Sequence, residues 1–155
     1  MIRLQKILVP TDFSESARLA LRYGVSFARE YKAEITLLHV VETLAVGYAS
    51  DLFPVPMAEV FQEISAYARK ELQSLAAEAR GQGVTVKELI GQGKPATEIL
   101  RVAQEDTIDI IVLGTHGKGV LDQALFGSTT ERVVRKAPCP VLTVRLAGHE
   151  FVDEK

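Results

Sequence analysis

The feature that most constrains the fold of this chain is a regular alternation of short, strand-like apolar runs with longer runs of helical periodicity. The short runs, typical of buried strands, cover residues 6–9, 34–41, 84–90, 107–113 and 141–145. Between them, apolar residues recur every three or four positions, which indicates helices over residues 14–31, 57–79, 94–103 and 128–136. This β-α-β-α-β-α-β-α-β order predicts an α/β fold, a five-stranded parallel sheet with helices on both faces.

Length and charge favour a single domain that builds its own core. A chain of 155 residues, 47% of them hydrophobic, buries enough apolar surface without disulfides or metals. We expect one domain over residues 1–146 and a polar, frayed tail over 147–155. With 18 Lys and Arg against 20 Asp and Glu, the chain has no basic field for nucleic acid and no polybasic run for a membrane.

The compartment follows from the single cysteine and from the start of the chain. Cys139 has no second cysteine to pair with, which fits a reducing environment. The first apolar run, Ile7–Pro10, is too short for a signal peptide or a membrane span. We therefore expect a cytoplasmic protein. The long irregular stretch Glu42–Pro56 fits a lid or binding loop and a plain surface excursion equally well.

Ligands of open α/β sheets bind beyond the carboxyl ends of the strands, so the residues that follow the strands are the candidates. After the first strand come Pro10, Thr11 and Asp12. Asp12 suits a hydrogen bond to a sugar or base, or a metal held on a phosphate, and it suits a simple turn as well. His39 lies in the apolar second strand, where we expect a core histidine.

A glycine-rich segment follows the fourth strand and is the most informative of these strand ends. Glycines let backbone N–H groups turn toward an anion, and the helix that starts at Ser128 adds the donors of its first turn. Lys118 is the only cation in this stretch before Arg132. The candidate phosphate-binding residues are Gly114, Thr115, His116, Gly117, Lys118, Gly119, Gly127, Ser128 and Thr129.

Other interpretations compete with phosphate binding. Ser128 to Glu131 matches a capping box, which alone would explain both residues as the start of a helix. The segment Gly91–Ala96 fits the Gly-x-Gly-x-x-Ala pattern of dinucleotide sites, but it follows the third strand, and Pro95 explains its turn. Cys139, between two prolines, indicates a rigid entry to the last strand. No His or Cys spacing indicates a metal site.

The residues Gly114–Gly117 and Gly127–Ser128 form the pattern Gly-x2-Gly-x9-Gly-Ser/Thr. This pattern resembles that of the ATP-binding branch of the universal stress protein family. The resemblance extends over Lys6–Asp12, Ile35–Val41 and Ala137–Val144, and so over nearly the whole chain.

The resemblance implies a Rossmann-like fold of the adenine-nucleotide alpha hydrolase type that binds ATP, ADP or AMP. Base and ribose would lie against Pro10, Thr11, Asp12 and Val40, and the phosphates over the glycine-rich segment. Mg²⁺ or Mn²⁺ would bind mainly through phosphate oxygens, with Asp12 as a weak protein ligand. The resemblance also implies a homodimer through the last strand, Val141, Leu142, Thr143 and Val144, whose apolar edge suits pairing.

We therefore expect an ATP-binding protein of stress response or regulation, in which the nucleotide is a ligand and an unknown regulatory partner acts downstream. Two other functions stay open. One is a slow ATPase or a self-phosphorylating enzyme that modifies Ser128 or Thr129, although no catalytic residue is assigned because no base is paired with a nucleophile. The other is a dimeric interaction module without nucleotide, in which the glycines are structural.

Overall fold

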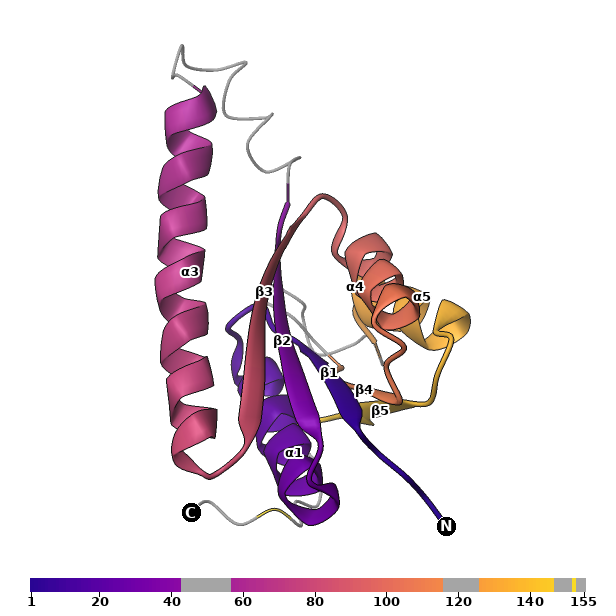
Figure 1. The fold of residues 1–155 in the computed structure, drawn as a ribbon. Coiled ribbons are helices and arrows are strands. Elements are labelled where there is room, and N and C mark those ends of the chain that lie inside the picture. Colours follow the sequence, from indigo (N-terminus) through magenta and orange to yellow (C-terminus); the bar gives the residue numbers. More distant parts are fainter. Residues whose placement is uncertain (43–56, 116–125, 147–151, 153–155) are drawn as a thin grey trace.

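The computed structural model describes residues 1–42, 57–115, 126–146 and 152. Strands and helices alternate along the chain as the sequence predicts (Figure 1). The strands are β1 (Lys6–Pro10), β2 (Glu34–Val41), β3 (Thr85–Gln92), β4 (Ile110–Gly114) and β5 (Val141–Val144). The helices are α1 (Glu15–Tyr31), α3 (Met57–Gly81), α4 (Pro95–Glu105) and α5 (Ser128–Lys136).

The five strands form one parallel sheet in the order β3-β2-β1-β4-β5. The central strand is β1, whose Ile7 pairs with Ile35 of β2 and with Ile110 of β4. Because β1 is covered on both faces, Ile7, Leu8 and Val9 are all 0% exposed. The predicted α/β fold with a five-stranded parallel sheet is confirmed.

The helices cover both faces of this sheet (Figure 1). On one face α1 and α3 pack over a cluster that includes Ile7 and Val9, and on the other α4 and α5 pack over a cluster that includes Leu8. Alternate residues of β1 thus serve opposite cores, as the pleat of a strand requires. The chain leaves β1 toward α1 and leaves β4 toward α5, on opposite faces, so the switch in direction lies between β1 and β4.

The ends of some elements differ from the prediction for local reasons. We expected a strand from Thr107, but β4 begins at Ile110. Thr107 has a left-handed φ of 50° and donates its N–H to the carbonyl of Gln104, so it closes helix α4 instead. Val152 lies in the segment that we expected to fray, yet its apolar side chain packs against the first cluster.

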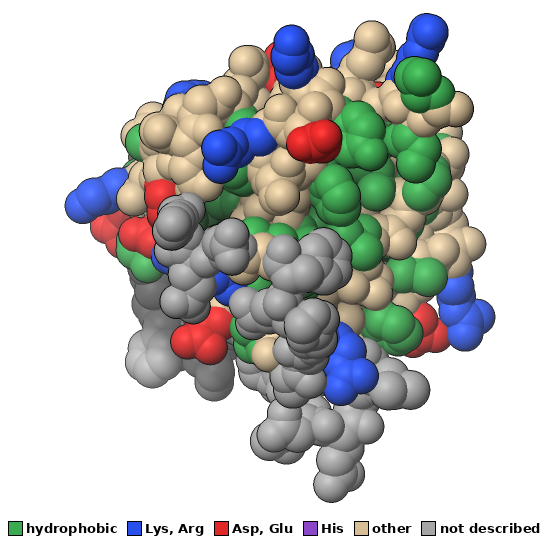
Figure 2. Space-filling view, turned by 90° about the horizontal axis from the view of Figure 1, so that it is seen from below, with side chains coloured by type: hydrophobic (Ala, Val, Ile, Leu, Met, Phe, Trp, Pro, Cys, Tyr) green, Lys and Arg blue, Asp and Glu red, His purple; other side chains and the backbone are tan. Residues whose placement is uncertain are grey.

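Figure 2 shows the molecule from below, at the amino ends of the strands and opposite their carboxyl ends. Lys and Arg side chains stand apart from one another on this face, with Asp and Glu among them and hydrophobic side chains between. Among the described residues, no helix combines the length and the hydrophobicity that crossing a bilayer requires.

Candidate functional site

A cleft of about 710 Å³ opens at the carboxyl ends of β1, β2 and β4, at the switch point of the sheet. Its volume lies within the range of small-molecule sites. Eight predicted site residues line it: Pro10, Thr11, Asp12, Val40, Gly114, Gly127, Ser128 and Thr129. The cleft therefore brings together the predicted residues from the first, second and fourth strand ends.

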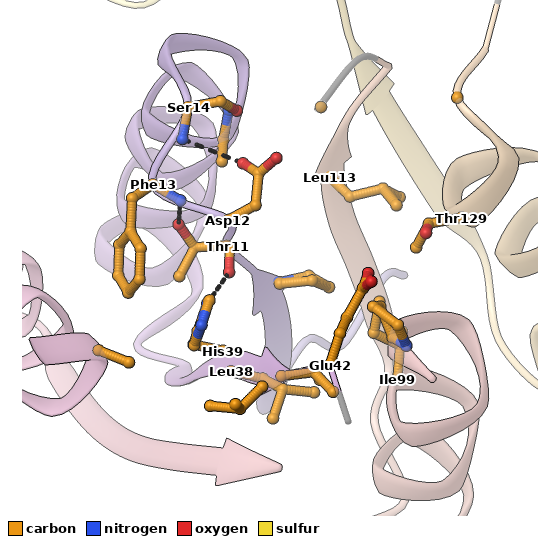
Figure 3. Close-up of a pocket in the computed structure, with 18 of the residues that line it drawn as sticks. Thr11, Asp12, Phe13, Ser14, Leu38, His39, Glu42, Ile99, Leu113 and Thr129 are labelled. Atoms are coloured by element: carbon orange, nitrogen blue, oxygen red, sulfur yellow. Dashed lines mark hydrogen bonds between the residues drawn. The ribbon is translucent and has the colours of Figure 1, made fainter. Parts of the chain in front are cut away.

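The turn after β1 is held by its own polar side chains (Figure 3). The Thr11 hydroxyl accepts from Phe13 N at 3.0 Å, and Asp12 Oδ1 accepts from Ser14 N at 3.0 Å. Ser14 in turn caps α1 by accepting from Ala17 N at 3.2 Å. Phe13 adopts a left-handed φ of 66° within this turn. These bonds stabilise the turn that carries Asp12, so Asp12 both makes the turn and lines the cleft.

His39, which we expected in the core, lines the cleft instead. Its Nδ1 lies 2.8 Å from the Thr11 carbonyl oxygen, and because a carbonyl only accepts, Nδ1 carries the proton. The ring stacks on Phe13 with 4.4 Å between centroids (Figure 3). His39 thereby ties the end of β2 to the turn after β1.

Sequence reasoning did not identify several other residues that line the cleft. Glu42 follows β2 and extends into the cleft (Figure 3), and its position directly after a strand is the signal that could have identified it. Ile64 and Tyr67 of α3, and Ile99 of α4, come from helices that the fold brings over the strand ends. No local pattern marks these helical residues as part of a site.

The end of β4 and the start of α5 are bound tightly to each other. The Thr130 hydroxyl donates to the Gly114 carbonyl at 2.9 Å, and Gly127 N donates to the Thr115 carbonyl at 2.8 Å. Thr115 is not among the lining residues, since it is 1% exposed and its N–H donates to Val144 O of β5. These bonds direct the first turn of α5 toward the cleft.

The start of α5 decides between two interpretations of the same residues. A capping box requires Ser128 as the N-cap, but the N-cap is Gly127, which has no side chain to cap the helix. Glu131 does not reach back to the helix start, because it pairs with Arg135 at 2.9 Å. The capping-box interpretation is therefore wrong. The first turn of α5 presents its N–H groups and the positive end of its dipole beside Ser128 and Thr129, which line the cleft.

The charges around the cleft are uneven. Asp12 and Glu42 line it, and none of its described lining residues is Lys or Arg. Within the described part of the chain, no group of three or more His, Cys, Asp or Glu residues is arranged to hold a metal ion by itself. Outside the cleft, burial raises the pKa of the Cys139 thiol, and Glu98 raises that of the Arg101 guanidinium through a hydrogen bond. Neither Cys139 nor Arg101 lines the cleft.

Several predicted residues lie outside the described part of the chain. These are His116, Gly117, Lys118 and Gly119 of the glycine-rich segment, and residues 43–56 of the irregular stretch after β2. The two ends of the glycine-rich segment, Gly114–Thr115 and Gly127–Thr129, are described, and both of them reach the cleft or support it.

Comparison with known proteins identifies several that are similar to this chain in sequence and structure. Universal stress protein MJ0577 of Methanocaldococcus jannaschii is 32% identical over 93% of this chain and 96% of its own. Its solved structure matches with a TM-score of 0.84 at 33% identity, covering 96% of this chain and 100% of that one. UspA from Lactobacillus plantarum matches with a TM-score of 0.80 at 30% identity, over 94% and 100% of the two chains.

Two more distant structures share the fold, a universal stress protein in complex with cAMP and one from Archaeoglobus fulgidus in complex with dAMP. They are 21% and 22% identical to this chain, with TM-scores of 0.71 and 0.64, respectively. Each match covers 93% of this chain, and the matches cover 98% and 99% of the two solved chains. The model of the universal stress protein family matches residues 3–145. On this match and these relatives, the chain belongs to the universal stress protein family.

Proposed function

We propose that this protein binds an adenine nucleotide, ATP first among them, as a member of the ATP-binding branch of its family. The nucleotide acts as the ligand of a regulatory protein of the stress response, in the cytoplasm, and signals to a partner still to be identified. The observation that carries the proposal is the start of α5, whose N-cap is a glycine without a capping side chain and which opens into a cleft of about 710 Å³ at the switch point.

The residues that line the cleft suit the two halves of a nucleotide. Val40, Leu38 and Ile99 offer apolar contacts for a base, and Thr11 and Asp12 offer oxygens for ribose hydroxyls. The N–H groups of the first α5 turn and the Ser128 and Thr129 hydroxyls suit phosphate. The relatives solved with cAMP and dAMP carry adenine nucleotides, which supports adenine as the base.

A divalent cation fits the acidic lining of this cleft. Mg²⁺ and Mn²⁺ are commonly bound by one or two carboxylates together with the phosphates of a substrate. Asp12 and Glu42 both line the cleft, so Asp12 would hold the ion, with the phosphates as its main ligands. When bound, the ion supplies charge neutralisation between the phosphates and these carboxylates.

A homodimer through β5 belongs to the same proposal. β5 is the last strand of the sheet, and Val141, Leu142 and Thr143 are half-buried there. The carbonyls of Pro140 and Val144 accept from β4 and its following residue, so the alternate carbonyls of Val141 and Thr143 point to the open edge. An edge with which no described strand pairs suits a second copy of the same strand.

Calorimetric titration of nucleotide-stripped protein with ATP, ADP and AMP, with and without Mg²⁺, tests the proposal. The informative variant is Ser128→Glu, with Ser128→Gln as its matched neutral control. A carboxylate in the first turn of α5 favours the helix by roughly 0.3–1 kcal/mol, yet it repels phosphate. Ser128→Glu should therefore keep or raise the melting temperature and abolish binding, while Ser128→Gln should retain most of it.

The outcomes separate the three functions that the sequence leaves open. Saturable binding of one nucleotide per chain with no phosphate release supports a nucleotide-binding regulator. Phosphate release above background, or phosphate found on Ser128 or Thr129 by mass spectrometry, would make the protein an enzyme. No binding of any adenine nucleotide, or equal binding by Ser128→Glu and Ser128→Gln, would refute the proposed site.

A further inference from the structure

A second cavity of about 430 Å³ adjoins the nucleotide cleft between the starts of α4 and α5. The two cavities share Glu42, Pro95, Ser128 and Thr129 in their walls, so a ligand seated on Ser128 and Thr129 borders both. The second cavity is completed by Gly93, Lys94, Ala96 and Arg132. It therefore continues the cleft past the point where the proposed function puts the phosphates.

The segment Gly91–Ala96, whose glycine pattern has no function assigned from the sequence, forms part of the wall of this cavity. Gly93 has a φ of 123°, a conformation open to glycine, and it donates its N–H to the Val41 carbonyl at 3.0 Å. This turn anchors the start of α4 beside the end of β2. Lys94 is the N-cap of α4, and its side chain makes no capping hydrogen bond.

Positive charge distinguishes the second cavity from the first. Lys94 and Arg132 both line it, whereas the described lining of the cleft has Asp12 and Glu42 and neither Lys nor Arg. Across the described residues, neither Lys94 nor Arg132 takes part in a salt bridge. Glu98, the acidic residue one turn after Lys94, pairs with Arg101 instead. Glu42 is the only acidic residue in the described lining of the second cavity. Two cations thus face one carboxylate.

We propose that Lys94 and Arg132 form a subsite for the outer phosphates of a nucleoside di- or triphosphate. This inference rests on the proposed function, and it deepens it by naming the ligand class that the site selects. The first phosphate sits on the start of α5, and each further phosphate extends toward the two cations. The protein therefore distinguishes nucleotides by the number of their phosphates, binding ATP more tightly than ADP and AMP.

The charges of the nucleotide and of the cleft explain why selection by phosphate number needs a separate subsite. The charge of a nucleotide grows with each phosphate, while the cleft itself offers two carboxylates that repel it. A monophosphate finds enough donors at one helix start, but additional phosphates require cations. Lys94 and Arg132 supply them from α4 and from the second turn of α5, on two sides of the same cavity.

The test compares the affinities of AMP, ADP and ATP for the full chain and for Lys94→Gln, Arg132→Gln and the double variant, without divalent cation. Lys136→Gln, at the far end of α5, is the matched control. An exposed charge pair contributes about two- to fivefold in affinity, so the double variant should bind ATP roughly tenfold more weakly. AMP should change less than about twofold, and melting temperatures should stay constant because both side chains are exposed.

Salt dependence and a base-free probe give independent readouts. ATP binding to the wild-type chain should weaken more steeply with salt than AMP binding, and the double variant should lose that difference. Tripolyphosphate should compete with ATP on the wild-type chain and lose potency on the double variant. Equal affinity of the wild-type chain for AMP and ATP, or an equal loss of both in the double variant, would overturn the subsite and leave the proposed function standing. Failure of the wild-type chain to bind any adenine nucleotide would instead overturn the proposed function.

Discussion

Substituting Gly114 by alanine tests how the first glycine of the motif is used. A Cβ built at this position lies 2.1 Å from Ser16 Oγ, 2.8 Å from Ser16 C and 2.9 Å from Ser16 Cβ. Ser16 is 3% exposed in the first turns of α1, so its side chain has no room to move away. The backbone contact also requires the helix itself to shift. Gly114 therefore allows α1 to approach the end of β4, whatever else it does for a ligand.

The magnitude follows from these contacts. Forcing an extra methyl group into a packed site costs typically 1–3 kcal/mol, and a contact with backbone belongs at the upper end, so we expect Gly114→Ala to cost about 3 kcal/mol. For a chain of this size that corresponds to a loss of roughly 6–12 °C in melting temperature. Gly81→Ala is the matched control, because nothing lies within 4 Å of its Cβ, and it should be neutral or stabilise by up to about 1 kcal/mol.

A double-mutant cycle shows whether Ser16 is the cause. Ser16→Gly removes the two side-chain contacts and leaves only the contact at 2.8 Å with the backbone carbon. In urea unfolding, Gly114→Ala combined with Ser16→Gly should therefore be less destabilised than the sum of the single variants by at least about 1 kcal/mol. A cost of Gly114→Ala below about 1 kcal/mol, or simple additivity in the cycle, would refute the reasoning.

Four further outcomes are expected. Leu72→Ala, which empties a site 1% exposed beneath α3, should cost about 3 kcal/mol in urea unfolding, whereas Tyr67→Ala, at 61% exposure, should change stability by less than about 0.5 kcal/mol. Burial raises the pKa of the Cys139 thiol, so iodoacetamide should alkylate it more slowly than free cysteine at pH 8, and equal rates would contradict this. Thr143→Pro removes an N–H from the open edge of β5 and should yield monomers in analytical ultracentrifugation without unfolding the sheet. Gly127→Ser supplies a cap that competes with phosphate, so it should raise the melting temperature slightly and weaken ATP binding in titration calorimetry; tighter binding would contradict it.

The order of elements was predictable because burial leaves a clear local signal. A strand such as β1, covered on both faces, is a continuous apolar run, and an amphipathic helix such as α1 repeats its apolar residues every three or four positions. The start of β4 was not predictable in this way. Thr107 and Ile108 have strand-like side chains, but the hydrogen bond from Thr107 N to Gln104 O closes α4 first. At Thr107 the backbone conformation, and not the type of side chain, therefore decides where the strand begins.

The site was predictable where it depends on strand ends and unpredictable where it depends on helix packing. Thr11, Val40 and Gly114 come together because parallel strands end at one edge of a sheet. His39 followed the same rule, yet its apolar neighbours favoured a core position. Tyr67 entered the cleft only because α3 packs along that face of the sheet, and no spacing along the chain encodes that contact.

The two ends of the glycine motif serve different physical needs, which is why one pattern supported two interpretations. Gly114 is required by the approach of Ser16, a packing constraint that would exist without any ligand. Gly127 has an ordinary φ of −68°, so a serine would fit its backbone and would cap α5. Glycine at an N-cap costs the helix only a few tenths of a kcal/mol relative to serine. With glycine at this position, the N-cap has no side chain that would compete with the phosphate proposed to bind at the first turn of α5.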